Sequence, residues 1–203
     1  MARTSVESVE TLPAFWDRIW QVLTHAVGTA RHPFHTPAVA TLEGNQPRVR
    51  VVVLRHADSA HLTLRFHTDA RTPKVAQMQA GSRVELCFYS PDDRLQVRCA
   101  GIARVHHNDE VAEEKWQASA LLSRRCYTTP YAPGDLSATP TSGLPADLEG
   151  REPTEEEANP GYAAFCVVEV AIQEIDALLL AFTGHRRAKW SAVDEWKGTW
   201  LIP

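Results

Sequence analysis

The chain has 203 residues and a mass of 22.6 kDa, which suits one domain, 1–203, that can bury a full hydrophobic core without disulfides or metals. A formal net charge of -4 and a pI near 6.1 exclude an overall positive field that would attract nucleic acid or an anionic membrane surface. No stretch approaches the ~20 apolar residues of a transmembrane helix, and the N-terminal segment lacks the apolar run of a signal peptide. We therefore expect a cytoplasmic protein.

The spacing of cysteines and histidines indicates no metal site and no disulfide framework. The cysteines are far apart and form no CxxC motif: Cys87, Cys99, Cys126 and Cys166. Three of them lie in strand-like runs, where a cysteine is typically a small buried apolar residue. His32 and His35 flank Pro33 in a loop-like stretch, so we interpret them as a surface pair.

Residues 11–28 have the pattern of an amphipathic helix. Thr11 suits the N-cap, Pro13 suits the first turn, and Gly28 can end the helix. Apolar residues recur at helical spacing, and we expect them to face the core: Phe15, Ile19, Val22, Leu23 and Ala26.

From residue 37 to residue 101 the pattern changes to the alternation of β-strands. We predict strands over 37–43, 48–55, 61–68, 83–89 and 94–106. Turn residues separate these runs, and a single short helix at about 73–80 interrupts them, so the sheet is expected to be mostly antiparallel. The predicted fold is mainly β with flanking helices (α+β), an antiparallel β-barrel that is closed or nearly closed.

The second half of the chain contains a helix, a long loop and the last strands. Residues 108–124 are predicted to be helical, with Asn108 as N-cap. Residues 128–161 contain six prolines and an acidic run, so we expect a flexible surface loop there. Residues 162–183 and the closing WKGTWLIP regain β character and must complete the barrel.

A first candidate binding segment is FHTDARTPKVAQM. Thr72 suits an N-cap, Pro73 suits the first helical position, and Gly81 can end the helix, so Lys74 falls in the first turn. The helix dipole disfavours a lysine there and favours a phosphate, which the free amides and Lys74 would bind together. The alternative is a solvated lysine, and this segment alone does not decide between the two.

Two further segments carry polar groups on strands. RVVVLR, from Arg50 to Arg55, places an arginine at each end of an apolar run that we interpret as a strand buried on both faces. Such arginines bind phosphates or form structural ion pairs with carboxylates. In DRLQVRCAG, Gln96 can donate and accept hydrogen bonds at the edge of a ring, or it can simply lie on an exposed strand face.

Together these three segments resemble the pyridoxamine 5'-phosphate oxidase-like family of FMN-binding split barrels. The resemblance runs from about residue 37 to residue 101 and returns in HRRAKW and WKGTWLIP. It implies an FMN cofactor, contacted by Arg50, Val51, Val52, Val53, Leu54, Arg55, His67, Thr68, Arg71, Thr72, Lys74, Gln96, Arg186 and Trp190. It assigns Arg50, Thr68, Thr72 and Lys74 to the phosphate, with Gln96 and the backbone around 52–54 at the ring. It also implies a homodimer with flavin sites at the subunit interface.

The resemblance departs from the vitamin oxidases at several positions. They usually carry lysine where Arg55 stands and arginine where Pro73 stands, and Arg71 is our candidate to replace the latter's phosphate contact. LLSRRCYTTPYAPG does not clearly reproduce the Tyr, Arg and Ser that hold their substrate phosphate. We therefore expect an FMN-dependent oxidoreductase whose substrate is not identified, and we name no catalytic acid or base. A flavin carrier or sensor without turnover, and a deazaflavin- or haem-binding relative, remain alternatives.

Overall fold

The computed structural model describes residues 9–78 and 82–203. Its α-helices are α1 (Leu12–Gly28), α2 (Pro73–Met78), α3 (Glu110–Gln117), α4 (Leu121–Arg124) and α5 (Glu155–Ala158). Its strands are β1 (Ala38–Glu43), β2 (Gln46–Val51), β3 (Leu54–Asp58), β4 (Thr63–Asp69), β5 (Arg83–Ser90), β6 (Leu95–His106), β7 (Phe165–Leu179), β8 (Arg186–Ser191) and β9 (Thr199–Leu201). Short 3-10 helices are η2 (Pro33–His35), η3 (Arg125–Tyr127), η4 (Ala146–Leu148), η5 (Asn159–Ala164) and η6 (Ala192–Asp194).

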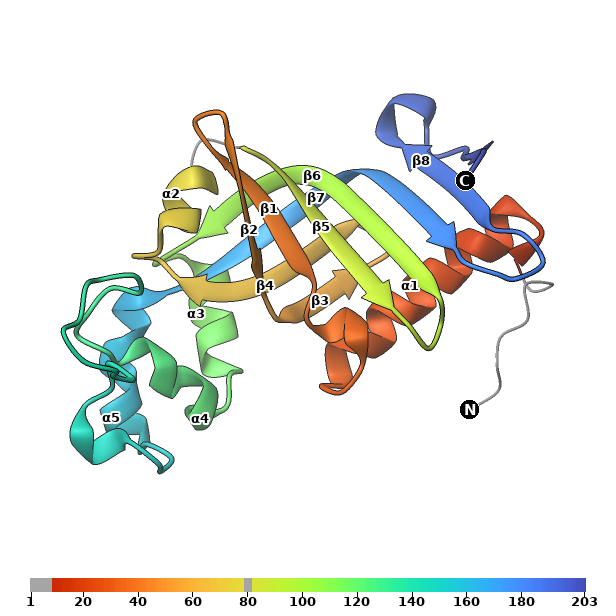
Figure 1. Cartoon of the computed structure of the whole chain (residues 1–203). Coiled ribbons are helices and arrows are strands. Elements are labelled where there is room, and N and C mark those ends of the chain that lie inside the picture. The colour runs from red at the N-terminus through yellow and green to blue at the C-terminus, as the bar shows by residue number, and fades with distance from the viewer. Residues whose placement is uncertain (1–8, 79–81) are drawn as a thin grey trace.

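The strands form one antiparallel sheet in the order β2-β1-β5-β6-β7-β4-β3, with β8 beside β7 and β9 beside β8. The chain passes directly from β2 to β3, yet these two strands are opposite ends of the main path (Figure 1). None of the described residues pairs β2 with β3, and we call the interval between them the seam. The prediction of a mainly β, nearly closed antiparallel barrel is therefore confirmed. The barrel is split at the seam.

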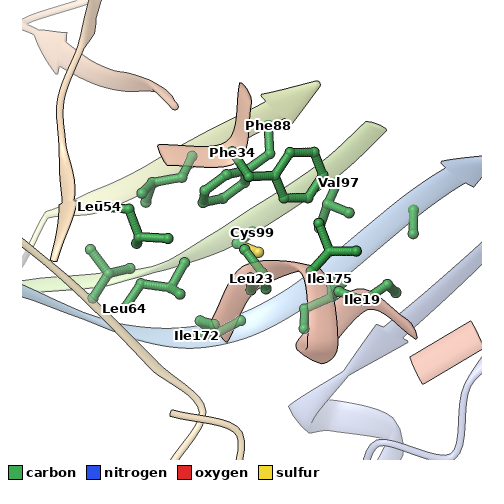
Figure 2. Packing of buried hydrophobic residues seen from close by; sticks show 14 of the residues in the cluster. Ile19, Leu23, Phe34, Leu54, Leu64, Phe88, Val97, Cys99, Ile172 and Ile175 are labelled. Atoms are coloured by element: carbon green, nitrogen blue, oxygen red, sulfur yellow. The ribbon is translucent and has the colours of Figure 1, made fainter. Parts of the chain in front are cut away.

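The core lies between helix α1 and the inner side of the sheet. Thr11 caps α1 by accepting a hydrogen bond from the amide of Ala14 at 3.4 Å, as predicted. All five residues of the predicted apolar stripe are buried. Figure 2 shows Leu23 of α1 near Cys99 of β6, within a cluster that also contains Leu54 of β3. This continuous packing fixes the strands that carry the candidate site.

One predicted strand and one predicted helix differ from the structure. The predicted strand 48–55 is two strands, because β2 ends at Val51 and the chain leaves that edge before β3 begins at Leu54. Val51 is 64% exposed, so the interpretation as a strand buried on both faces is wrong. The predicted helix 108–124 is broken into α3 and α4, and Asp109, not Asn108, is its N-cap. Asn108 has a φ of 55°, in the left-handed region.

Residues 128–161, predicted as a loop, contain η4, α5 and the start of η5. Leu148 is 3% exposed and Arg125 donates hydrogen bonds to the carbonyl oxygens of Leu148 and Arg151, at 3.3 and 2.5 Å. A capping box at Thr154 and Glu157 starts α5. Part of this segment therefore packs against the domain. Among the described residues, none of the helices combines the length and apolar character needed to cross a bilayer.

Candidate functional site

A cluster of hydroxyl groups and cationic side chains surrounds α2 at one end of the barrel. Lys74 Nζ donates to the hydroxyls of Thr68 and Thr72, at 2.7 and 3.2 Å. Arg50 reaches the same helix from β2, donating to Gln77 Oε1 at 3.1 Å and to the hydroxyl of a β1 residue, Thr41, at 2.5 Å. We call these groups the cationic cluster: Thr41, Arg50, Thr68, Thr72, Lys74 and Gln77. Four of these residues were predicted from two segments, Arg50 from one and Thr68, Thr72 and Lys74 from the other, and the structure brings them together.

The positive charge of this cluster is not neutralised by nearby carboxylates. Among the described residues, no carboxylate oxygen lies within 4.0 Å of the charged nitrogens of Arg50 or Lys74. Both side chains are half-buried. Burial lowers the pKa of Lys74, and the neighbouring charge of Arg50 lowers it further. Partly desolvated cations without counter-ions fit a multiply charged anion such as a phosphate.

Helix α2 begins at Pro73, as predicted. Within the described residues α2 extends only from Pro73 to Met78, and the last predicted residues, including Gly81, lie outside them. The Thr72 hydroxyl donates to the carbonyl oxygen of Asp69 at 2.7 Å. The side chains of the cationic cluster, and not the dipole of α2, carry the case for an anion.

Arg71, a predicted phosphate contact, has other partners in the structure. Its Nε and Nη2 donate to the two carboxylate oxygens of Asp69, at 3.0 and 2.6 Å. Its Nη1 donates to the carbonyl oxygen of Thr129 at 3.0 Å. The hydrogen bonds to Asp69 raise the pKa of Arg71. Arg71 therefore lies beside the cationic cluster, and its guanidinium donates to Asp69 and Thr129.

A cleft of about 360 Å³ lies between the strands β3 and β4 and the helices α3 and α4. It is lined by Arg55, His56, Arg65, His67, Lys115, Ala118, Ser119, Ala120 and Ser123. Arg55 stands at a β-bulge, because Leu54 pairs with Phe66 and His56 pairs with Arg65, which leaves Arg55 without a partner on β4. Bulges commonly re-aim side chains beside functional sites. Two predicted site residues, Arg55 and His67, thus line one cleft.

The cleft carries a surplus of positive charge. Arg65 is paired with Glu169 at 2.5 Å and Lys115 with Glu114 at 2.8 Å, whereas the described residues offer Arg55 no carboxylate within 4.0 Å. The pKa of His67 is lowered to about 4, chiefly by burial and further by the charges of Arg55 and Lys115. His67 is therefore neutral at pH 7, and an anion in the cleft would meet cationic groups and hydroxyls.

The remaining predicted residues lie at the other end of the sheet. Gln96 is opposite Leu178 of β7, whereas Thr68 of the cationic cluster is opposite Cys166 of the same strand. Twelve residues of extended strand span roughly 40 Å. Figure 1 shows the same separation, with α2 and β8 at opposite ends of the barrel. One flavin mononucleotide is too short to contact both ends within one chain.

Two predicted residues on β8 share this distant end. Trp190 is 3% exposed and packs against Phe15 and Trp16, with ring centroids 5.8 and 5.6 Å away, so it is part of the core of this chain. Arg186 lines a cleft of about 280 Å³ with His185, Arg187, Trp200, Leu201 and Glu10. Its Nη2 lies 3.3 Å from Glu10 Oε1. The structure therefore does not bring Gln96, Arg186 and Trp190 to the cationic cluster.

The segment 51–54 connects the two edges of the seam. The amide of Val52 donates to the carbonyl oxygen of Pro37 at 3.0 Å, which continues the β1–β2 pairing by one bond. Val53 belongs to neither strand, and Leu54 is fully buried. This connection places Arg50 and Arg55 on opposite sides of the seam.

The histidine and cysteine predictions are only partly correct. His35 is buried and its Nδ1 lies 2.8 Å from the carbonyl oxygen of Ala26, so His32 and His35 are not a surface pair. Cys99 and Cys166 are buried as predicted, but Cys87 is half-buried and Cys126 is exposed. Within 9–78 and 82–203, no group of three metal-binding side chains comes together.

Comparison with known proteins identifies the domain. Residues 14–107 match the family model described as "Pyridoxamine 5'-phosphate oxidase, FMN-binding domain". This part of the chain is an FMN-binding domain of the pyridoxamine 5'-phosphate oxidase-like kind. The match contains the cationic cluster, Arg55, His67 and Gln96. Curated protein sequences gave no match.

Two solved structures share the fold of this FMN-binding domain and of the segments around it. One is a pyridoxamine 5'-phosphate oxidase-related, FMN binding protein from Nostoc punctiforme PCC 73102, with a TM-score of 0.70 and 22% identity over 93% of this chain and 97% of that one. The other is PhzG from Burkholderia lata 383 in complex with tetrahydrophenazine-1-carboxylic acid, with a TM-score of 0.68 and 16% identity over 97% and 100%. Both likenesses extend over almost the whole split barrel.

The residues present fit the phosphate of FMN, because the cationic cluster offers three threonine hydroxyls and two positive charges that have no carboxylate partner among the described residues. The sequence did not reveal that Thr41 and Gln77 contact Arg50, nor that Lys115, Ser119 and Ser123 line the cleft. The cleft was missed because 108–124 was predicted as one continuous helix, whereas the chain breaks between α3 and α4, where Ser119 lies.

Proposed function

We propose that this chain is an FMN-dependent oxidoreductase that passes electrons between a reduced substrate or a nicotinamide and an acceptor. The cationic cluster carries the proposal, because Arg50 and Lys74 are half-buried, lack carboxylate partners among the described residues and converge with the hydroxyls of Thr68 and Thr72. These groups would hold the FMN phosphate. Bound FMN would supply a ring that accepts and donates hydride equivalents.

The ring system would extend from the cationic cluster along residues 52–54 toward the cleft. In this arrangement Arg55 and His67 border the space beside the ring, with Lys115 on the opposite wall. Cationic groups and serine hydroxyls favour an anionic second reactant, and a neutral His67 can accept a hydrogen bond. The carboxylic acid bound by the Burkholderia protein supports an anion of this kind.

The same proposal includes a homodimer, because the predicted contacts lie at opposite ends of one chain. A two-fold arrangement would bring Gln96 and Arg186 of one subunit to the cationic cluster of the other. The outer face of β1, β2 and β5 also exposes apolar side chains, among them Leu42, Val49 at 66% and Val51 at 64%. Exposed apolar patches on a sheet are typical of subunit interfaces.

The experiment that tests this function compares FMN with riboflavin, which lacks the phosphate. Lys74→Ala and Arg50→Ala each remove a charge-assisted contact worth ~1.5 to 3 kcal/mol, which is roughly a ten- to hundredfold loss of FMN affinity. Riboflavin affinity should change far less. Arg48→Ala is the matched control, because Arg48 is exposed and paired with Glu43. Equal losses for both ligands would place the phosphate elsewhere.

Two alternatives are separated from this function by simple measurements. A deazaflavin- or haem-binding protein would show a different absorption spectrum after purification. A flavin carrier or sensor would show the flavin spectrum, but the bound flavin would be neither reduced by nicotinamide or by anionic reductants nor reoxidised by air. Reduction and reoxidation of bound FMN over many cycles would support the oxidoreductase.

A further inference from the structure

The turn between β4 and α2 is built around a buried carboxylate. Asp69 is 7% exposed, and its side chain accepts hydrogen bonds from the backbone amide of Arg71 at 2.8 Å and from the Arg71 guanidinium at 3.0 and 2.6 Å. The carbonyl oxygen of Asp69 accepts from the amide and the hydroxyl of Thr72, at 3.2 and 2.7 Å. Asp69 therefore fixes the turn through both its side chain and its backbone.

The fixed turn determines where the hydroxyls of the cationic cluster lie. Thr68 directly precedes Asp69, and Thr72 is the residue that Asp69 holds. Both hydroxyls accept from Lys74 Nζ. A rotation of the turn would separate the hydroxyls of Thr68 and Thr72 from Lys74 Nζ. The Asp69–Arg71 pair is not part of the cationic cluster, but it determines where these groups lie.

Arg71 also connects this turn to a distant part of the chain. Its Nη1 donates to the carbonyl oxygen of Thr129, near the start of the segment 128–161. The adjacent amide of Ala70 donates to the carbonyl oxygen of Ala164 at 2.7 Å, just beyond the end of that segment. Both ends of the segment thus hold the turn in place.

We infer that Arg71 is a positioning residue, which holds the cofactor-binding turn through Asp69 and Thr129, and is not a ligand of the flavin phosphate. This inference rests on the proposed function, in which the cationic cluster binds that phosphate. Three of the five N–H groups of Arg71 already donate to Asp69 and Thr129, so Arg71 could turn its guanidinium fully toward the phosphate only by leaving Asp69. A buried carboxylate without its partner is strongly destabilising, and its charge would repel the phosphate.

Measured affinities of Arg71→Lys, Asp69→Asn and the double variant for FMN and riboflavin distinguish the two roles. A positioning pair requires the planar fork of arginine, so both single variants should bind FMN about tenfold more weakly, and the double variant should be no worse than either. A phosphate ligand predicts the opposite: lysine would retain most of the affinity, and Asp69→Asn would tighten FMN binding because it removes a negative charge.

The ³¹P resonance of bound FMN gives a second readout. A positioning role predicts that Arg71→Lys and Asp69→Asn shift this resonance in the same direction, because both loosen the same turn. Opposite shifts, or a shift with Arg71→Lys alone, would overturn the inference. Arg48→Lys is the matched control for a salt-bridged surface arginine and should change neither affinity nor resonance.

Failure of this inference can be told from failure of the proposed function. If Lys74→Ala leaves FMN affinity unchanged, the cationic cluster does not bind the phosphate and the proposed function fails. If Lys74→Ala weakens FMN binding while Arg71→Lys does not, only the positioning role is overturned. If Asp69→Asn fails to fold, the FMN affinity of Arg71→Lys alone decides between a positioning residue and a phosphate ligand, because lysine retains the positive charge.

Discussion

Gly101 of β6 lies against the backbone of Ala171 of β7, so closely that a Cβ on Gly101 would stand 2.2 Å from the Ala171 carbonyl oxygen. A β-bulge causes this approach, because Ala100 pairs with Glu174 whereas Gly101 pairs with Ile172. Only a residue without a side chain fits there.

Gly101→Ala should therefore destabilise the barrel by about 1 to 3 kcal/mol or more, because backbone must move to admit the methyl group. Gly28→Ala is the control, since a Cβ at Gly28 has no neighbour within 4 Å. Urea unfolding of the two variants and the parent measures the difference. Equal free energies of unfolding for the parent and both variants would show that β6 and β7 can move apart at Gly101 without loss of stability.

The separation of Gln96 from Lys74 leads to a test of the dimer by complementation. Lys74→Ala and Gln96→Ala homodimers should each bind FMN weakly. When the two variants are mixed and allowed to exchange subunits, each mixed dimer should contain one site with both substitutions and one wild-type site. Titration should then reveal a fraction of sites with parental affinity.

Solution scattering of the parent chain complements that experiment. A particle of twice 22.6 kDa is expected when flavin is bound. A monomer with flavin fully bound, or no recovery of tight sites on mixing, would mean that Gln96 does not complete a site on a partner subunit.

The segment 128–161 should tolerate change in one part and not in another. Residues 134–142 are all exposed, so their replacement by a short Gly/Ser linker should shift the melting temperature by only a few degrees. Leu148 is buried, and Leu148→Ala should cost roughly 2 to 5 kcal/mol. Thermal melting of the two variants decides the matter. A large loss from the linker variant would show that the exposed residues cover another surface, such as a partner subunit.

The stability of the domain should depend on pH through His67. Its pKa is lowered to about 4 in the fold, whereas an unfolded histidine titrates near 6.5. Between these values the unfolded state binds a proton that the folded state does not, so the free energy of unfolding falls as pH drops from about 6.5 to 4. The total loss is up to about 3 kcal/mol and is complete below pH 4.

Urea unfolding of the parent and of His67→Gln at several pH values measures this contribution. The parent should lose more stability than the variant in that window, and identical pH profiles would contradict the assignment. An anion bound in the cleft should raise the pKa of His67, because it offsets the charges of Arg55 and Lys115. A titration of the imidazole resonance with and without the anion would reveal that shift.

Local patterns in the sequence predicted much of this fold, and long-range pairings account for what they missed. The spacing of Phe15, Ile19 and Leu23 indicates a helical face whichever partner covers it. The run from Arg50 to Arg55 shows apolar character, but no periodicity reveals that the chain leaves one edge of the sheet and begins another. The hydrogen bond from Arg71 to the carbonyl oxygen of Thr129 and the bulge at Arg55 likewise depend on pairings that local spacing does not reveal.

The seam between β2 and β3 has a mechanical consequence. Val52 and Val53 alone separate the two strands in sequence, and two extended residues span at most about 7 Å. Arg50 and Arg55 lie on the two sides of this short connection. A ligand that engages both guanidinium groups would act as a staple across the edges, and amide exchange in these edge strands should slow when it binds. A bound ligand would then make the barrel more rigid along the seam, where the described residues form no pairing between β2 and β3.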